Sequence, residues 1–516
     1  MSAAPCTSGS PRPPSDRVRE RSPNESFAAA TRARRLEVAR CLSALLPSDC
    51  LLSREEELRP YECDALAAYR QQPLLVALPR TESQVCAVMR ECRRLGVPLV
   101  ARGGGTGLSG GAMPHAAGVL LSLARFDRIL ELDPLARTAR VQPGVRNLAV
   151  SEAAAAFGLY YAPDPSSQLA CTIGGNVAEN SGGVHCLKYG LTVHNVLKVR
   201  GCTVDGELIE LGGAALDAPG LNLLALALGS EGLLLVVTEV LLKLIPKPEV
   251  AQVVMASFDD VGKAGEAVAA IIGAGIIPAG LEMMDRRATA AVEPFVKAGY
   301  DLSAEAILLA ESDGTADEVA EEVAAIEAVV RTAGATALAV SHSEAERLRF
   351  WSGRKNAFPA AGRLSPDYYC MDGTIPRRRL GEVLRAIAQM EEKYGLRCLN
   401  VFHAGDGNLH PLILFDANQP GQWERAEHFG SEILELCVSF GGTVTGEHGV
   451  GVEKLNPMCV QFSAAERAAF FAIKEAFDPP GLLNPGKAIP TLARCAEYGR
   501  EHVRRGHARH PDLPRF

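Results

Sequence analysis

Apolar residues recur along the chain with both the helical and the strand period. Residues 83–95 carry them three and four positions apart, which predicts an amphipathic helix, and residues 147–157 predict another. Short apolar runs predict strands at residues 97–101, 118–123 and 139–143. We therefore expect helices and strands to be mixed through the first half of the chain.

One apolar run, residues 221–245, is long enough to suggest a membrane span. It is interrupted by two glycines and four polar residues, namely Gly229, Gly232, Ser230, Glu231, Glu239 and Lys243. We therefore predict buried core, with a strand over residues 233–244 that closes a first domain. The two prolines of LIPKPEV, residues 244–250, mark a domain boundary.

The length of 516 residues leaves room for about three domains. The first 35 residues contain seven Arg and therefore resemble a transit peptide. Three acidic residues and five prolines in the same stretch disfavour an amphipathic helix, so we predict a disordered tail over residues 1–35.

Composition narrows the class of protein. Hydrophobic residues make up 47% and charged residues 22%, as in ordinary globular proteins. The net charge of −8 and the absence of a basic face argue against a nucleic-acid partner. The 14 cysteines are scattered and form no CxxC pair, which indicates reduced thiols in a cytoplasmic chain without an iron–sulfur cluster of its own.

A glycine-rich segment, VPLVARGGGTGLSGG, occupies residues 97–111 and satisfies the GxGxxG pattern. A dinucleotide-binding Rossmann unit would also begin a helix at the last glycines, whereas a strand-like run follows here. We therefore predict strand–loop–strand. Six glycines in nine residues still allow backbone N–H groups to converge on an anion such as a pyrophosphate.

A second glycine-rich segment, PDPSSQLACTIGGNVAENSGG, occupies residues 163–183. One such segment alone is equally well explained as a flexible loop. Two loops about 70 residues apart suit a long, diphosphate-linked cofactor laid across the first domain.

Residues 403–410 read HAGDGNLH, and residues 446–449 read GEHG. Apolar stretches flank the first motif, so a β-hairpin would swing His403 and His410 towards each other. Together with Glu447 they suit a divalent metal with one open position, and His448 is a neighbouring base. A single histidine beside such a turn would more simply be a surface residue. Zinc is the metal expected first, although iron and manganese use similar ligands.

From about residue 55 onwards, ordered motifs resemble those of the FAD-linked 2-hydroxyacid dehydrogenases, within the vanillyl-alcohol oxidase type of flavoproteins. They are PxxxxQV (79–85), RGGGTGLSGG, PDPSS, TIGGNVAENSGG, GSEG (229–232), HAGDGNLH, GEHGVG and FDPPGLLNPGK. Three further segments resemble the FAD-binding D-type subunits of bacterial glycolate oxidases (glycolate dehydrogenases). They are HCLKYGLTVHN (185–195), RKNAFPA (354–360) and YYCMDGTIPRR (368–378).

The resemblance implies an α+β fold in which an FAD-binding domain of the vanillyl-alcohol oxidase type precedes an antiparallel-sheet substrate (cap) domain. We place the FAD-binding domain at residues 36–248 and the cap domain, with the metal site, at residues 249–450. Residues 451–516 would be a C-terminal helical segment that returns to complete the flavin site.

The resemblance also implies which residues bind FAD. The first loop would cradle the pyrophosphate, the second would follow the isoalloxazine and ribityl portion, and GSEG would close the adenine side. The residues are Arg102, Gly103, Gly104, Gly105, Thr106, Gly107, Leu108, Ser109, Pro163, Gly174, Gly175, Asn176, Asn180, Ser181, Gly182, Gly183, Glu231, Gly232 and Asn484. Relatives with covalent flavin carry histidine at the position of Thr106, so noncovalent FAD is expected.

For a 2-hydroxy acid, Arg354 matches the family position that clamps the carboxylate. A solvated arginine on a helix face is the alternative for this residue. The metal would lower the pKa of the substrate hydroxyl, and His448 would take its proton as hydride leaves for the flavin. Asp406 and Asn408 would hold the turn and the histidine tautomers.

The activity that this resemblance implies is dehydrogenation of a small D-2-hydroxy acid, with glycolate to glyoxylate expected first. D-lactate dehydrogenation with a quinone or cytochrome acceptor, and a D-2-hydroxyglutarate type, are alternatives. The apolar Leu412, two residues after His410, favours a small substrate. A noncatalytic assembly subunit would have no need of these residues together. The implied partners are a second FAD-fold subunit and an iron–sulfur subunit, in a complex peripherally associated with the inner face of the cytoplasmic membrane.

Overall fold

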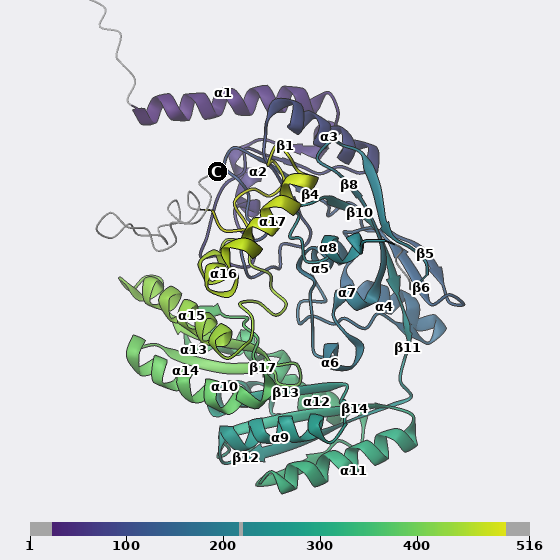
Figure 1. Ribbon diagram of the computed structural model, residues 1–516, viewed down its shortest axis with the longest axis vertical. Helices are drawn as coiled ribbons and strands as arrows, with labels where there is room; N and C mark the ends of the chain where they lie inside the picture. The colour runs from purple at the N-terminus through teal and green to yellow at the C-terminus, as the bar shows by residue number, and fades with distance from the viewer. Residues whose placement is uncertain (1–22, 216–219, 492–516) are drawn as a thin grey trace, which may run out of the picture.

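The computed structural model describes residues 23–215 and 220–491. Figure 1 shows two parts that meet along a seam. The N-terminal part runs to β11 (Ile245–Pro246) and includes the returning C-terminal segment, while the central part runs from β12 (Val250–Phe258) to α15 (Gln422–Ser439). Residues 1–22 of the expected tail and residues 492–516 of the expected C-terminal segment lie outside the described residues.

The N-terminal part begins with a sheet in the order β1-β2-β4-β3, in which β2, β4 and β3 run parallel. Its strands are β1 (Leu51–Leu52), β2 (Leu75–Ala77), β3 (Leu99–Arg102) and β4 (Val119–Ser122). The helices α1 (Pro23–Ser43) and α3 (Glu82–Leu95) pack on it, because Val38 and Val85 lie in one buried cluster with Leu75. Thr81 caps the start of α3 by accepting the N–H of Gln84.

An antiparallel sheet in the order β5-β6-β10-β8-β9 completes this part. Its strands are β5 (Ile129–Asp133), β6 (Thr138–Val141), β8 (Val196–Cys202), β9 (Leu208–Gly212) and β10 (Val236–Lys243). In β10, Val240 and Leu242 are fully buried while the residues after each are half-exposed, as the strand period requires. Helices packed around this sheet include α4 (Asn147–Ala154), α5 (Ile173–Glu179), α7 (Thr192–Asn195) and α8 (Leu223–Ala227).

The central part is built on an antiparallel sheet in the order β15-β12-β14-β13-β17-β18-β16. Besides β12, its strands are β13 (Gly280–Asp285), β14 (Ala306–Gly314), β15 (Ala337–Val340), β16 (Asp367–Cys370), β17 (Arg397–His403) and β18 (Asn408–Phe415). Both faces are covered by helices. Alternate residues of β14 therefore enter different clusters, Leu308 on one face and Leu309 on the other.

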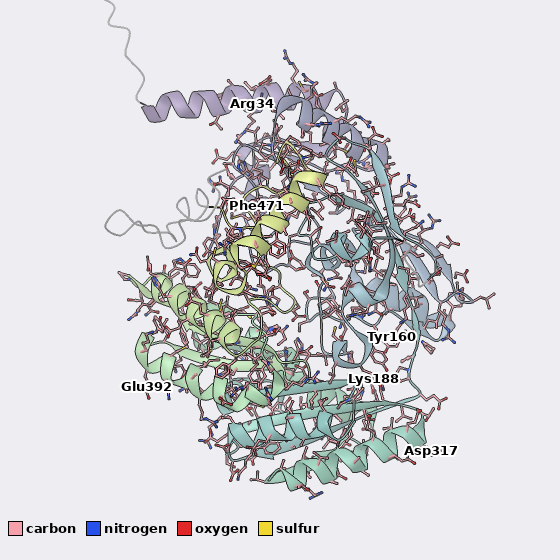
Figure 2. The ribbon with its side chains drawn as sticks, in the orientation of Figure 1. Arg34, Tyr160, Lys188, Asp317, Glu392 and Phe471 are labelled. Atoms are coloured by element: carbon pink, nitrogen blue, oxygen red, sulfur yellow. The ribbon has the colours of Figure 1, made fainter. Side chains whose placement is uncertain are left out.

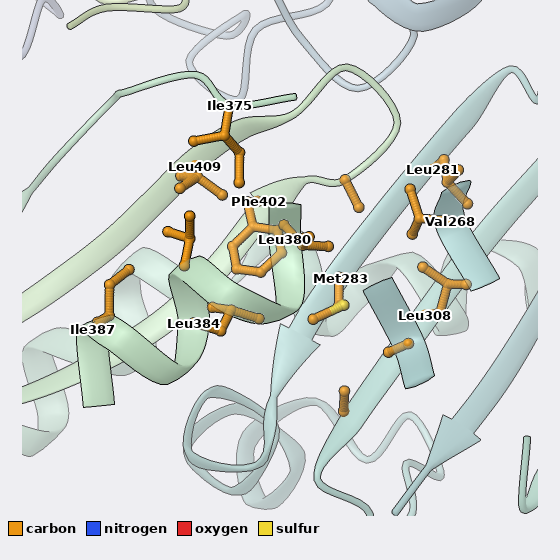
Figure 3. Close-up of a cluster of buried hydrophobic side chains, with 14 of the residues drawn as sticks. Val268, Leu281, Met283, Leu308, Ile375, Leu380, Leu384, Ile387, Phe402 and Leu409 are labelled. Carbon is orange, nitrogen blue, oxygen red and sulfur yellow. The ribbon is translucent and has the colours of Figure 1, made fainter. Parts of the chain in front are cut away.

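One face packs against α9 (Val261–Gly273), α11 (Ala316–Thr332), α14 (Leu380–Tyr394) and α15. Figure 3 shows part of this cluster, with Phe402 of β17 and Leu409 of β18 close to Leu380 and Leu384 of α14. The opposite face packs against α10 (Arg286–Val296), α12 (Glu344–Lys355) and α13 (Ala357–Leu364). The sheet is thus held rigidly on both sides, which fixes the ends of β17 and β18.

The chain returns to the N-terminal part through α16 (Leu455–Gln461) and α17 (Ala464–Phe477). After α17, Leu483 forms a parallel bridge with Leu99, at the edge of the first sheet. The ammonium of Lys474 donates to the carbonyls of Leu233 and Leu483, each at 2.7 Å. The shorter elements are η1 (Ser48–Cys50), α2 (Glu55–Leu58), η2 (Arg59–Tyr61), β7 (Leu159–Tyr160), α6 (Cys186–Tyr189) and η4 (Arg377–Arg379).

Charged side chains join the two parts across the seam. His185 lies between two carboxylates, with Nδ1 2.7 Å from Asp164 and Nε2 3.2 Å from Glu311 of β14. Close by, Lys188 pairs with Asp313 at 2.5 Å, and Figure 2 labels Lys188 where the two parts face each other. The orientation of the central part is therefore set by specific ion pairs as well as by chain connectivity.

The predicted mixture of elements is confirmed. The expected helices correspond to α3 and to α4 with the one-turn η3 (Ala155–Phe157), and the expected early strands to β3, β4 and β6. The strand–loop–strand prediction also holds, because residues 103–118 between β3 and β4 are all described and contain no helix. The α+β class, with C-terminal helices that return to the first domain, matches the observed architecture.

The predicted disordered tail is wrong for residues 23–35, which form the first part of α1. All five prolines of the tail lie at or before Pro23, and a proline at the start of a helix costs little. The apolar residues that anchor α1, Val38 and Leu42, lie beyond residue 35. Residues 24–35 contain no proline, so the proline content of the whole stretch does not oppose a helix there.

The prediction of buried core for residues 221–245 is correct only for the later part. Leu233, Leu234 and Leu235 are buried, whereas Leu221 is 86% exposed and two leucines of α8, Leu223 and Leu226, are also exposed. The turn at residues 229–232 separates the exposed leucines from the buried ones. Among residues 23–215 and 220–491, no helix has both the length and the apolar character needed to cross a membrane.

Candidate active site

A cavity of about 400 Å³ lies between the two parts. The N-terminal part contributes the first glycine loop, the segment before and within α5, and the turn around Glu231. The other side is formed by the end of α12, the start of α13, and the histidines of β17, β18 and the following loop. Predicted site residues in its lining are Arg102, Gly103, Gly104, Gly105, Thr106, Gly107, Leu108, Gly174, Gly175, Asn176, Ser181, Glu231, Gly232, Arg354, His403, His410, Glu447 and His448.

The first glycine loop is packed too closely for side chains. A Cβ at Gly104 would lie 2.6 Å from the carbonyl oxygen of Ala170, and a Cβ at Gly103 would overlap Oγ1 of Thr172. Gly105 has a φ of +69° and faces the guanidinium of Arg102, which donates to the carbonyl of Cys63 at 2.6 Å. This wall of the cavity is therefore mostly backbone, as a pyrophosphate cradle requires.

The second glycine-rich segment is a helix where a loop was expected. Residues 173–179 form α5, and Thr172 caps it by accepting the N–H of Gly175 at 3.4 Å. Gly174 sits in the first turn because a Cβ there would lie 2.5 Å from Cβ of Pro143. Gly174 thus allows close helix packing beside the cavity, a role that glycine content alone did not distinguish from loop flexibility.

Several predicted cofactor residues lie behind the wall and support it. The side chain of Asn484 donates to the carbonyls of Gly111 and Glu231, at 3.0 and 2.6 Å. The carbonyl of Pro163 accepts from Asn147, and Asn180 ends α5 with a φ of +52°. The predicted residues outside the lining are Ser109, Pro163, Asn180, Gly182, Gly183 and Asn484.

The predicted hairpin of HAGDGNLH is present and brings its histidines together. Strands β17 and β18 pair antiparallel with His403 opposite Asn408, and the two imidazole centroids lie 5.0 Å apart. Oε1 of Glu447 lies 3.3 Å from Nε2 of His403 and 3.1 Å from Nε2 of His410. Three potential ligand atoms thus converge on one point.

The electrostatic surroundings of the three converging ligand atoms favour a bound cation. Both ring nitrogens of His410 are buried and have no hydrogen-bond partner among the described residues, although Nε2 is close to Glu447. Burial, together with nearby His448 and His403, lowers the pKa of His410 well below its usual value, so the ring is neutral and offers a lone pair. Burial opposes charge on His403, but Glu282 and Glu447 outweigh it and raise its pKa.

Glu282 of β13 links His403, a predicted metal ligand, to the predicted substrate clamp. Its Oε1 accepts from Nδ1 of His403 at 2.6 Å, and its Oε2 accepts from Nε of Arg354 at 2.7 Å. Glu282 and Arg354 are almost fully buried, at 1% and 2% exposure, so Arg354 is no solvated helix-face residue. The tautomer of His403 is therefore set by Glu282, rather than by Asp406 or Asn408 as expected.

Asp372 organises the loop that carries Glu447 and His448. This fully buried carboxylate accepts the backbone N–H groups of Gly446, Glu447 and His448 and pairs with the ammonium of Lys454 at 2.9 Å. Burial raises the pKa of Asp372, but the charge of Lys454, followed by His448 and His410, outweighs it and holds that pKa far below its usual value. Asp372 also lies within ligand distance of His410 and His448. Because its oxygens are already occupied and face a cation, the set with Glu447 fits a metal better.

His448 adjoins this centre without belonging to the ligand set. Its Nε2 lies 3.9 Å from Oε1 of Glu447, and its buried Nδ1 has no hydrogen-bond partner in the described part of the chain. Burial lowers the pKa of His448, although Asp372 and Glu447 oppose that effect. A neutral imidazole with a free nitrogen beside the cavity can accept a proton.

The size argument from Leu412 is wrong. Leu412 follows His410 by two residues and lies on the same face of β18, but it is fully buried in the cluster with α12 and α13. Those helices cover the strand immediately beyond His410, so Leu412 does not line the cavity. The lining beside Arg354 instead includes Lys355, Phe358 and Pro359, which were not predicted as site residues.

The comparisons agree with this geometry. A family described as FAD binding domain matches residues 73–212, and one described as FAD linked oxidases, C-terminal domain, matches residues 247–488. "Glycolate oxidase subunit GlcD" of Escherichia coli (strain K12) is 61% identical over 93% of this chain and 97% of its own length. The chain belongs to the FAD-linked oxidase family.

More distant relatives fall in the same family. "Glycolate oxidase subunit GlcD" of Bacillus subtilis (strain 168) is 39% identical over 84% of this chain and 93% of its own length. A D-lactate dehydrogenase of Archaeoglobus fulgidus is 31% identical over 88% of this chain and 99% of its own. The solved structure of p-cresol methylhydroxylase is similar with a TM-score of 0.75, covering 89% and 98% of the two chains at 18% identity.

These findings confirm the expected flavoprotein fold and FAD as the cofactor of this FAD-linked oxidase. They also confirm that it is an oxidoreductase. The groups that sequence reasoning missed, Glu282, Asp372 and Lys454, come from distant segments. Asp372 lies in YYCMDGTIPRR, a motif used for the resemblance, so that motif was the available signal. Glu282 lies between the apolar residues Leu281 and Met283 of β13, and its full burial implies a partner.

Proposed function

We propose that this protein oxidises a small D-2-hydroxy acid, glycolate first, to the 2-oxo acid, using noncovalently bound FAD and a divalent metal. The observation that carries this proposal is the bridge through Glu282. It ties a buried arginine to a histidine of the His403, His410 and Glu447 group, beside the glycine-lined cavity. The family and the GlcD relatives support the reaction and the substrate.

The residues fit both absent groups. Gly103 and Gly104 line the cavity with backbone, which suits a diphosphate, and Thr106 stands where covalent-flavin relatives carry histidine. Two imidazoles and one carboxylate form a donor set that zinc accepts. FAD supplies a hydride acceptor, and a divalent cation acts as a Lewis acid that makes the substrate hydroxyl more acidic.

The chain's own residues perform the remaining tasks. Arg354 binds the substrate carboxylate through the guanidinium nitrogens that Glu282 leaves free. His448 accepts the hydroxyl proton as the hydrogen on Cα departs as hydride, so the substrate loses two electrons and two hydrogens. Phe358 and Pro359 narrow the cavity beside Arg354 and help to exclude water.

Anaerobic mixing of the purified, FAD-loaded protein with a panel of 2-hydroxy acids tests this proposal. We expect glycolate to bleach the flavin absorbance most efficiently, with D-lactate slower and L-lactate inactive. Preference for D-lactate would change the substrate while leaving the chemistry intact. No bleaching by any 2-hydroxy acid, or full activity in protein shown by mass spectrometry to lack metal, would overturn the proposal.

We further propose that the chain works as one subunit of a complex. The support is that its GlcD relatives are described as subunits. The expected partners are a second FAD-fold subunit and an iron–sulfur subunit, through which the complex would associate with the inner face of the cytoplasmic membrane. Affinity purification of the tagged chain from its native cells, followed by mass spectrometry and iron analysis, checks this composition.

A further inference from the structure

Glu179 is a buried acid on the cavity wall that the proposed reaction does not use. It is the last residue of α5 and lines the cavity together with Ser181. A Cβ at Gly449, directly after His448, would overlap its Oε2, and a Cβ at Gly111 would lie 2.8 Å from its Oε1. The carboxyl group therefore sits where the first glycine loop meets the loop that carries the proposed base.

The same end of α5 also reaches the proposed metal site. A Cβ at Gly182, three residues after Glu179, would lie 2.7 Å from Oε2 of Glu447. The segment from 179 to 182 thus runs along the reacting end of the cavity rather than its far end. Glu179 therefore lines the same cavity as the glycine loop and the histidines.

The hydrogen-bonding capacity of Glu179 is not used within the described part of the chain. Its Oε2 is buried and has no hydrogen-bond partner there. The neighbouring carboxylates differ in this respect. Glu231 accepts the N–H groups of Val450 and Gly451, both at 2.7 Å, and Asp64 accepts that of Leu66 at 3.0 Å.

The nearby ammonium groups are engaged elsewhere. Lys454 donates to Asp372 and to the carbonyl of Gly449, each at 2.9 Å. Lys487 donates to the carbonyl of Gly111 at 2.8 Å and to that of Met113. Burial, followed by the charges of Glu231 and Asp64, raises the pKa of Glu179 well above its usual value. Burial and the neighbouring carboxylates therefore favour the protonated form of this side chain, in which it has an O–H to donate.

We propose that Glu179 is a cofactor contact, whose carboxyl O–H donates a hydrogen bond to an acceptor atom on the pyrimidine half of the bound flavin. Carbonyl oxygens and ring nitrogens on that half gain negative charge when the flavin is reduced. A donor aimed at them stabilises the reduced form more than the oxidised form. Glu179 would thereby raise the reduction potential of the flavin and favour hydride transfer from the substrate.

The proposal predicts a difference between two variants in the absence of substrate. Glu179→Gln keeps an N–H donor of similar size, whereas Glu179→Leu removes the donor. A hydrogen bond to a charged group is worth roughly a ten- to hundredfold change in an equilibrium constant. For Glu179→Leu we expect the reduced-to-oxidised ratio at a fixed potential to fall at least tenfold, a shift of about 30 mV for a two-electron couple.

The measurement is the midpoint potential of FAD in the purified holoprotein, by dye-linked reduction, with the flavin absorption band recorded in parallel. Glu152→Gln, an exposed acid on α4, is the matched control and is expected to leave both values unchanged. Glu179→Gln is expected to stay close to wild type. Because no hydroxy acid is needed and FAD binding is a family property, this result does not depend on the proposed substrate.

Three outcomes would overturn the proposal. Both Glu179 variants could retain the wild-type potential and spectrum, which would show that Glu179 does not contact the flavin ring. Glu179→Gln could change the potential as much as Glu179→Leu, which would assign the effect to charge rather than to a donor. Glu179→Leu could lose FAD while the remaining bound flavin keeps its potential, which would leave Glu179 with a packing role.

Discussion

The two walls of the cavity differ in what they offer a ligand. The wall from the N-terminal part is mostly backbone, with Gly103 and Gly104 placed where any Cβ would meet neighbouring atoms. The wall from the central part consists of buried side chains, including Arg354 and His403, that share Glu282 as a hydrogen-bond partner. Ligand binding at the first wall therefore depends on the absence of side chains. At the second wall it depends on the charge and protonation of the side chains. We therefore expect a substitution in the first wall to weaken FAD binding, and a substitution in the second wall to reduce turnover while FAD stays bound.

The largest effect is expected from His410→Ala, which removes a proposed metal ligand. Turnover of glycolate should be lost, while FAD stays bound because the glycine-lined wall lies on the other part of the protein. Metal content by mass spectrometry should fall in parallel with turnover. His428→Ala is the control, since His428 is exposed on α15 and its Nδ1 lies 2.6 Å from the carbonyl oxygen of Glu424 in the same helix. Stoichiometric loss of flavin from His410→Ala would show that the two walls are not separable.

His448→Ala should slow flavin reduction by about 10²- to 10⁴-fold near neutral pH, the usual contribution of a general base. Substrate affinity should change much less, because Arg354 still binds the carboxylate. Raising the pH should partly restore the rate, since the substrate hydroxyl can then lose its proton to solvent. Anaerobic stopped-flow measurements across pH test all three effects. A wild-type rate of reduction would exclude His448 as the base.

Arg354→Lys keeps the positive charge but loses the planar fork that can contact Glu282 and a carboxylate together. We expect kcat/KM to fall by about one to two orders of magnitude, with FAD content unchanged. Arg349→Lys, at an exposed position on the same helix, is the matched control. Equal steady-state kinetics for both variants would remove Arg354 from the substrate site.

A smaller effect is expected on the backbone wall from Gly104→Ala. The new methyl group would lie 2.6 Å from the carbonyl of Ala170, so the loop must shift and FAD affinity should fall about tenfold. Equilibrium titration of the apoprotein with FAD measures this. Gly362→Ala, in α13 with no atom within 4 Å of the added Cβ, should leave FAD affinity unchanged. An unaltered FAD affinity in Gly104→Ala would show that the absence of a side chain at this position does not determine FAD binding.

Local patterns predicted elements that depend on nearby residues. The hairpin of HAGDGNLH was predictable because a turn-rich run separates two apolar strands, and the observed register brings His403 and His410 together. The strand–loop–strand around Gly103 was predictable because no helix signal follows the glycines. The same approach gave the wrong prediction for residues 173–179, where a loop was expected and a helix is present. A glycine that permits a loop also permits close helix packing against Pro143.

By itself the sequence determined the classes of element, the family and the residue types that can perform oxidation of a hydroxy acid. These follow from periodicity and motifs, which are local properties of the chain. Only the tertiary structure decided which carboxylates serve the site. Glu282, Asp372 and Glu179 come from three separate segments, and each acts through partners more than 50 residues away in the sequence. The physical reason is that the hydrogen bonds and the pKa of a buried carboxylate depend on the donors and charges around it. The packing of distant segments decides which donors and charges those are.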